Sequence, residues 1–154
     1  MRFDTIIHNA VLITCNPRFD ILRPGWIGIR RGRIAALDSQ TAAARRPAAA
    51  ETVDARGGIV MPGLVNTHTH LPMTLFRGLA DDLPLAAWLE KHIFPAERAA
   101  LHPETIRWGA LLACAEMILS GTTTCADGYF HEDAVAQAVQ AAGLRAVLAQ
   151  GVID

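Results

Sequence analysis

Two histidines one residue apart, His68 and His70, are the residues of this sequence best suited to chemistry. Imidazole nitrogens bind zinc and other first-row divalent metals. Side chains two positions apart on a β-strand point to the same face, so a strand would aim both rings at one ion. His-x-His is a short motif, however, and two ligands do not complete a tetrahedral site. The alternative is that the two histidines merely end a strand.

The segment before the pair predicts a strand that places the histidines at its carboxyl end. Residues 58–65 form a continuous apolar run, which is typical of a strand covered on both faces. Active sites of (β/α)₈ enzymes lie at the carboxyl ends of such strands. The position of His68 and His70 therefore favours the metal-site interpretation over the bare strand end.

The residues after the pair predict alternating helices and strands. We expect a helix over residues 84–94 that Pro95 ends or kinks, and a stronger helix over residues 103–120 that Gly121 closes. A strand over residues 122–127, a helix over residues 132–143 and a strand from residue 145 follow. Alternation of this kind predicts parallel strands joined by crossover helices, and hence an α/β fold.

The first 57 residues predict a small antiparallel β region. Trp26–Arg30 and Arg33–Leu37 form a candidate hairpin around Arg31 and Gly32. The segment FDTIIHNAVLIT predicts short strands broken at His8 and Asn9, and residues 38–51 predict a surface loop or weak helical turn.

Composition and charge exclude several classes of protein. With 51% hydrophobic and 19% charged residues the chain can form a packed core, and a net charge of −1 argues against nucleic-acid or membrane partners. Three cysteines without CxxC spacing indicate a reducing compartment. The N-terminus lacks a signal-peptide core, and the apolar run over residues 108–119 is too short to span a bilayer. We therefore expect a cytoplasmic protein.

Two long segments resemble a known family. MPGLVNTHTHLPMTLFRGLADDLPLAAWLEKHIFPAE and SGTTTCADGYFHEDAVAQAVQAAGLRAVLAQGVID resemble the metal-dependent amidohydrolase superfamily, and are most similar to the branch of 5-methylthioadenosine/S-adenosylhomocysteine deaminases and triazine chlorohydrolases. The resemblance covers about residues 25–154. It implies that residues 58–154 begin a (β/α)₈ TIM barrel, with about three of its eight strands. It also implies that residues 1–57 are part of a small β-sandwich domain.

The resemblance also implies roles for four residues. His68 and His70 would be ligands of one divalent metal, with zinc as the first candidate and iron or manganese left open. Glu97 would bind the ribose hydroxyls of an adenosine-type nucleoside, because a carboxylate accepts strong hydrogen bonds from adjacent hydroxyls; without the resemblance it would be a solvated charge. Trp88 would line the substrate pocket, although a core role in its helix is as good an interpretation.

The remaining candidates are weaker. His131 would start a helix or line the site, and Asp127 could support the site without binding the metal. His92 would lie on a helix surface and His102 at a helix entry.

The implied reaction is hydrolytic deamination of 5-methylthioadenosine, S-adenosylhomocysteine or a related adenosine compound by a metal-bound hydroxide. The catalytic third histidine, glutamate and aspartate of the family are expected on later strands. We therefore expect a fragment that is inactive and poorly soluble alone, while a homo-oligomeric full-length enzyme stays open. Two alternatives remain: another hydrolase of the triazine or guanine type, and a non-catalytic metal-binding remnant.

Overall fold

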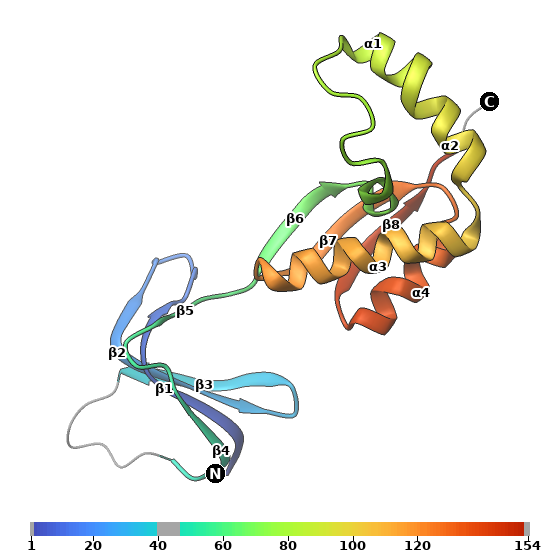
Figure 1. Ribbon diagram of the computed structural model, residues 1–154. Coiled ribbons are helices and arrows are strands. Elements are labelled where there is room, and N and C mark those ends of the chain that lie inside the picture. Colours follow the sequence, from blue (N-terminus) through green and yellow to red (C-terminus); the bar gives the residue numbers. More distant parts are fainter. Residues whose placement is uncertain (1, 40–46, 153–154) are drawn as a thin grey trace. The chain divides into compact units, whose positions relative to one another are not determined.

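The computed structural model describes residues 2–39 and 47–152 and consists of two compact units, Met1–Pro62 and Gly63–Asp154 (Figure 1). The described residues of the first unit form strands and no helix, and the second unit contains a parallel sheet with helices. No helix of the described residues is long and apolar enough to cross a membrane.

The first unit is one mixed sheet. It comprises β1 (Phe3–Ile13), β2 (Ile21–Arg30), β3 (Arg33–Ser39), β4 (Ala49–Asp54) and β5 (Ile59–Val60), in the order β3-β2-β1-β4 with β5 also paired to β1. The predicted hairpin is confirmed: β2 and β3 are antiparallel. The turn residues Arg31 and Gly32 have φ angles of 51° and 69°. Positive φ at both central positions matches the twist of the flanking strands.

Two expectations for this unit are wrong. The sheet is not purely antiparallel, because β4 and β5 both pair with β1 in parallel. The segment around His8 and Asn9 does not break the strand, since β1 is continuous and only its register shifts there. Asn9 has a φ of 54°, which a short polar residue tolerates, and this produces an irregularity rather than an end. Half of the predicted loop, residues 40–46, lies outside the described residues, and its last three positions belong to β4.

The second unit is a three-stranded parallel sheet covered by helices on one face (Figure 1). Strands β6 (Leu64–Thr69), β7 (Thr122–Tyr129) and β8 (Arg145–Gln150) lie in that order, and α3 (Pro103–Leu119) and α4 (Glu132–Ala142) pack against the same face. The core between these layers contains Leu71, Ile106, Ala110, Cys114, Cys125, Val135, Ala138 and Val139. The predicted alternation of helices and parallel strands is confirmed for residues 64–150.

The apolar run before the histidines does not form the single strand that we expected. Ile59 and Val60 pair with β1 in the first unit, whereas β6 starts at Leu64 in the second. Pro62 has no N–H to donate and restricts the residue before it, so the run divides there. The expected cover on both faces is also absent among the described residues, because Leu64 is 50% and Val65 60% exposed.

The helical segment between β6 and β7 runs through Pro95. A 3₁₀ helix, η1 (Leu71–Phe76), follows His70, and then α1 (Leu85–Trp88), a π-helical turn η2 (Leu89–Ile93) and α2 (Phe94–Ala100) are continuous. Pro95 therefore does not end the helix. It lies in the first turn of α2, directly after the wider π turn, where a missing N–H costs least.

Contacts with α3 hold η1 in place beside the end of β6. Gly109 lets η1 approach, because a Cβ atom there would lie 2.8 Å from the Pro72 carbonyl oxygen and 2.9 Å from Leu75 Cγ. The Thr74 hydroxyl donates to the Gly109 carbonyl oxygen at 2.8 Å. The segment that follows His70 is thereby fixed to the longest helix of the unit.

Candidate active site

His68 and His70 bring two imidazole nitrogens together at the carboxyl end of β6. Both residues are exposed, and their Nε2 atoms lie 3.4 Å apart. Nitrogen ligands at about 2.0–2.1 Å from one tetrahedral zinc ion lie roughly 3.3–3.4 Å from each other. The separation of the two Nε2 atoms therefore fits two ligands of a single ion.

A bulge helps to place His68. Between the pairs Asn66–Cys125 and Thr69–Asp127, β6 advances three residues while β7 advances two. The N–H group of His68 donates to the Asn66 side-chain oxygen at 3.2 Å. A bulge re-aims a side chain, and the local bond to Asn66 satisfies a backbone donor at the irregular position.

The backbone of β7 fixes the tautomer of His70. Nδ1 of His70 lies 2.6 Å from the Gly128 carbonyl oxygen. A carbonyl oxygen only accepts hydrogen bonds, so Nδ1 carries the proton and Nε2 keeps its lone pair. Histidines that bind metals are held by such an outer hydrogen bond, and His70 is therefore prepared to bind through Nε2.

Asp127 holds the residues on both sides of His70. It is 4% exposed, and its Oδ1 accepts from the Thr69 hydroxyl at 3.1 Å and the Leu71 N–H at 2.7 Å. Burial raises the pKa of Asp127, while these hydrogen bonds act in the opposite direction. Its contacts make Asp127 a support of the His70 segment.

Glu132 forms a buried carboxyl pair with Asp127. The Glu132 side chain is at the start of α4 and is 7% exposed. Burial, followed by the charge of Asp127, raises the pKa of Glu132 to about 7. Sequence analysis missed this residue, because an acidic side chain in the first turn of a helix is normally exposed and interacts with the helix dipole.

Tyr129 connects His70 to Glu97. The Tyr129 hydroxyl donates a hydrogen bond to Oε1 of Glu97 on α2, and the Tyr129 ring centroid lies 5.7 Å from that of His70. Burial, followed by the bond to Glu97, raises the pKa of Tyr129, so its hydroxyl keeps the proton and is the donor. Sequence analysis did not single out Tyr129. The available indication was its position two residues after Asp127 on the same strand, and so on the same face.

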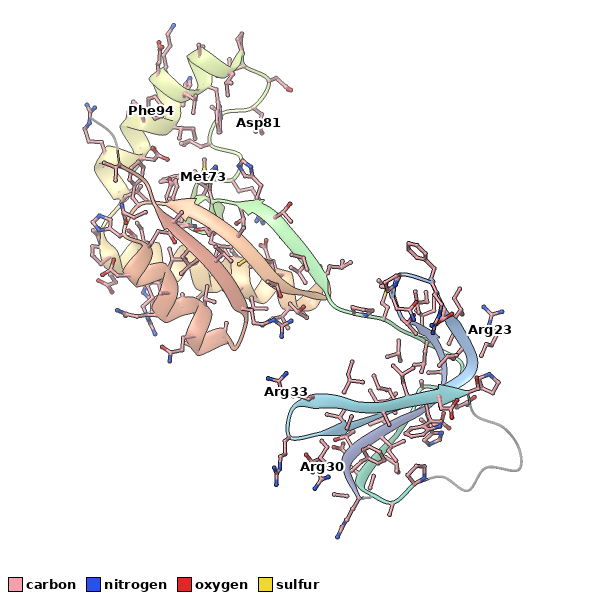
Figure 2. All side chains as sticks on the ribbon, turned by 180° about the vertical axis from the view of Figure 1, so that it is seen from behind. Arg23, Arg30, Arg33, Met73, Asp81 and Phe94 are labelled. Atoms are coloured by element: carbon pink, nitrogen blue, oxygen red, sulfur yellow. The ribbon has the colours of Figure 1, made fainter. Side chains whose placement is uncertain are left out.

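The metal-ligand candidates and Glu97 border different hollows. A small hollow of about 260 Å³ is bordered by His68, His70 and neighbouring residues of β6 and β7. A larger cavity of about 500 Å³ is lined by Phe94, Glu97, Arg98, Leu101, Phe130 and His131 (Figure 2 labels Phe94 on α2). Tyr129 joins the two sets of residues, because it contacts both His70 and Glu97. Trp88 is half-buried on α1 and is not among the residues that line either hollow.

Two further histidines, His102 and His131, lie at the starts of helices. His102 caps α3, as expected: its Nδ1 accepts from the Thr105 N–H at 3.5 Å, and the Thr105 hydroxyl accepts from the His102 N–H at 3.1 Å. His131 precedes α4 with a φ of 51°, as the helix-start interpretation predicts, and it lines the larger cavity.

Two ligands are all that the described residues provide. Among residues 2–39 and 47–152, no group of three or more histidine, cysteine, aspartate or glutamate side chains is arranged to hold a metal ion. Burial raises the pKa of the Cys114 thiol to about 11, so this cysteine stays protonated near neutral pH. The donor set of the candidate site is therefore the pair of imidazoles.

Comparison with known protein families shows to which family this chain belongs. The model of the Amidohydrolase family matches residues 59–154, which is more than half of the chain. The chain belongs to the amidohydrolase family. The predicted resemblance of the two segments, around His68 and from Ser120 onward, to the amidohydrolase superfamily is thus confirmed. The matched region contains His68, His70, Glu97 and Tyr129.

Curated amidohydrolase relatives are similar over nearly the whole chain. A 5'-deoxyadenosine deaminase of Methanosarcina mazei is 52% identical over 151 residues, which are 98% of this chain and 34% of the relative. A 5-methylthioadenosine/S-adenosylhomocysteine deaminase of Syntrophobacter fumaroxidans is 50% identical over 156 residues, covering 99% of this chain and 35% of that protein. The chain spans about a third of the length of these relatives.

Two solved structures have a fold similar to that of this chain. A zinc-bound adenosine deaminase from Xanthomonas campestris superposes with a TM-score of 0.90 at 41% identity, over 95% of this chain and 33% of that chain. Atrazine chlorohydrolase TrzN from Arthrobacter aurescens TC1, complexed with zinc, has a TM-score of 0.83 at 26% identity, over 95% and 35% of the two chains. The α/β class predicted from the sequence is confirmed.

Proposed function

We propose that this protein is a metal-dependent hydrolase that acts on a carbon–nitrogen bond and deaminates an adenosine-type nucleoside. The observation that carries the proposal is the pair of Nε2 atoms 3.4 Å apart, one of them on a ring whose tautomer the Gly128 carbonyl fixes. The relatives named as deaminases of 5'-deoxyadenosine and 5-methylthioadenosine support the substrate class.

His68 and His70 would hold one divalent metal ion, with zinc as the first candidate. When bound, the ion would supply Lewis-acid activation of water for attack on the purine carbon that bears the amino group. Zinc in two solved relatives supports this choice of metal. The two imidazoles leave further coordination positions to other ligands.

Glu97 would recognise the ribose. Its Oε1 accepts the Tyr129 hydroxyl proton, and its carboxylate borders the larger cavity, so its second oxygen is available to sugar hydroxyls. A carboxylate forms charge-assisted hydrogen bonds with adjacent hydroxyls. Trp88 is retained as a second substrate contact on the strength of the resemblance alone.

We also propose that the second unit forms part of a (β/α)₈ barrel. Its start lies at Gly63 rather than at residue 58 as expected, because Ile59 and Val60 pair with β1 of the first unit. The support is the parallel order β6-β7-β8, with His68 and His70 at the carboxyl end of β6, where barrel enzymes position catalytic groups. A cytoplasmic location is proposed from the cysteine pattern described above.

The test uses the protein expressed from its complete reading frame and loaded with zinc. We expect ammonia release from 5'-deoxyadenosine and 5-methylthioadenosine and none from atrazine, together with bound zinc in equilibrium dialysis. His68→Ala should lose zinc and activity together, whereas the control His92→Ala, on the π turn η2, should keep both. Zinc binding without nucleoside turnover would instead support the non-catalytic alternative, and turnover of atrazine alone would support the triazine alternative.

A further inference from the structure

The ring of Tyr129 is held on two sides. It is 6% exposed, and its centroid lies 5.7 Å from the His70 ring and 5.2 Å from the Phe130 ring. Aromatic rings at these distances pack favourably and restrict one another. The direction of the Tyr129 hydroxyl is therefore set by β7 and its neighbours, and not by α2.

The hydroxyl of this fixed ring reaches a carboxylate that comes from a distant part of the chain. Glu97 is half-buried on α2, 32 residues before Tyr129, and its Oε1 accepts the hydroxyl proton. A glutamate side chain has several rotatable bonds and loses considerable entropy when ordered. A buried donor with a fixed direction selects one orientation of the carboxylate before any ligand arrives.

We propose that Tyr129 is a positioning residue that orients Glu97, so that the second carboxylate oxygen faces the vicinal hydroxyls of a ribose. This inference rests on the proposed function. It assigns to the Tyr129 hydroxyl the orientation of the carboxylate that would bind the sugar. Because Tyr129 also packs on His70, it sets the position of the sugar-binding carboxylate relative to the candidate metal ligands.

A purely structural role for Tyr129 would have a different consequence. If the ring only filled space, loss of its hydroxyl would affect all nucleosides alike, through general destabilisation of the site. If the hydroxyl orients Glu97, its loss weakens only ligands that carry the diol. Tyr129→Phe separates these cases, because phenylalanine keeps the ring between His70 and Phe130 and removes one oxygen atom.

The experiment compares 5'-deoxyadenosine with its counterpart that also lacks the 2'- and 3'-hydroxyls. Both are tested against the zinc-loaded protein from the complete reading frame, by calorimetric titration and by steady-state kinetics. In Tyr129→Phe we expect the Kd and KM for the diol nucleoside to rise about 10- to 100-fold, the range for loss of a hydrogen bond to a charged group. Values for the diol-free nucleoside and the zinc content should change little.

A second variant tests whether the two residues act as a unit. Glu97→Gln should produce the same selective loss, and the double variant should be no worse than Glu97→Gln alone, because the effect of Tyr129 passes through Glu97. Glu90→Gln, an exposed glutamate on η2, is the matched control and should bind like the unmodified protein.

Two results would overturn the inference and can be told apart. Equal weakening of both nucleosides by Tyr129→Phe would reject the positioning role while leaving the proposed function intact. Failure of the unmodified protein to bind either nucleoside would reject the proposed function, and the positioning role with it.

Discussion

The imidazole of His70, directly after β6, is held by the Gly128 carbonyl oxygen of the neighbouring strand β7, at 2.6 Å. The contact joins a side chain to a backbone atom 58 positions away in the sequence. A carbonyl oxygen belongs to every residue, so no substitution at position 128 removes the acceptor itself. The orientation of His70 depends on the placement of β7, which the side chains around it maintain.

Asp127 is the first residue through which this dependence can be tested. Asp127→Ala removes the acceptor of the Leu71 N–H and the Thr69 hydroxyl, and should destabilise the fold by about 1–3 kcal/mol. It should also lower zinc affinity by about 10-fold or more, because His70 loses its outer support. Chemical denaturation and zinc titration measure the two effects. The control Asp133→Ala, at an exposed position of α4, should change neither, and unaltered zinc affinity in Asp127→Ala would contradict the anchoring role.

Glu132 predicts a pH dependence of stability. Its pKa in the folded state is about 7, above the ordinary value of 4.5, so folding favours the neutral carboxyl. The stability that Glu132 contributes is therefore present below about pH 4.5 and is lost as the pH rises through 7. Glu132→Gln keeps a neutral side chain at every pH and should be more stable than the unmodified chain at pH 8, by about 1 kcal/mol or more.

Thermal unfolding at pH 5 and pH 8 measures this difference. The exposed neighbour Asp133, replaced by Asn, provides the control and should leave the pH dependence unchanged. If Glu132→Gln retained the full loss of stability between pH 5 and pH 8, the buried carboxyl pair would not be its source.

Gly109 tests the packing of η1 on α3. In an exposed helix interior, alanine stabilises by about 1 kcal/mol relative to glycine. For Gly109→Ala we expect the opposite effect, a decrease of about 1–3 kcal/mol in the free energy of unfolding, because the new Cβ would lie 2.8 Å from the Pro72 carbonyl oxygen. The free energy of unfolding from denaturant titration decides the sign, and a more stable Gly109→Ala would show that the contact is not tight.

Arg31 offers a stabilising substitution in the first unit. Its φ of 51° is unfavourable for arginine, and Gly32 follows with 69°. Arg31→Asn creates the Asn-Gly pair that type I′ turns prefer and keeps the backbone bond from position 31 to Asp4 Oδ2 at 2.6 Å. We expect the free energy of unfolding to rise by about 0.5–1 kcal/mol, which would be measured as a higher melting temperature. The control Gly32→Ala should lower the melting temperature, and a gain there would contradict this account of the turn.

Elements with strong end signals could be predicted from the sequence. The helix from Glu132 to Ala142 ends at Gly143, whose φ is 75°, and the hairpin turns at Arg31 and Gly32. In both cases the deciding interaction is local, so the residue types alone carry the information. The strand boundary at Pro62 was available by the same logic, but the apolar run on either side of it obscured the break.

Contacts between distant segments could not be predicted. Nothing near Glu97 indicates that Tyr129 will donate to it, and nothing near Glu132 indicates that Asp127 will share its burial. The placement of His68 and His70 on one face was inferred from strand alternation, yet β6 contains a bulge at this point. Their Nε2 atoms converge with the help of the bulge and the next strand, which alternation does not describe.

Three consecutive residues of β7 act on His70 in three different ways. Asp127 accepts hydrogen bonds from the Thr69 hydroxyl before it and the Leu71 N–H after it. The Gly128 carbonyl oxygen holds its ring nitrogen, and Tyr129 packs against its ring. A slip of one position between β6 and β7 would break all three contacts at once and turn Asp127 and Tyr129 to the opposite face. Metal binding therefore depends on the register between β6 and β7. Only the correct register orients His70 for binding, so molecules with a shifted register would fail to bind metal.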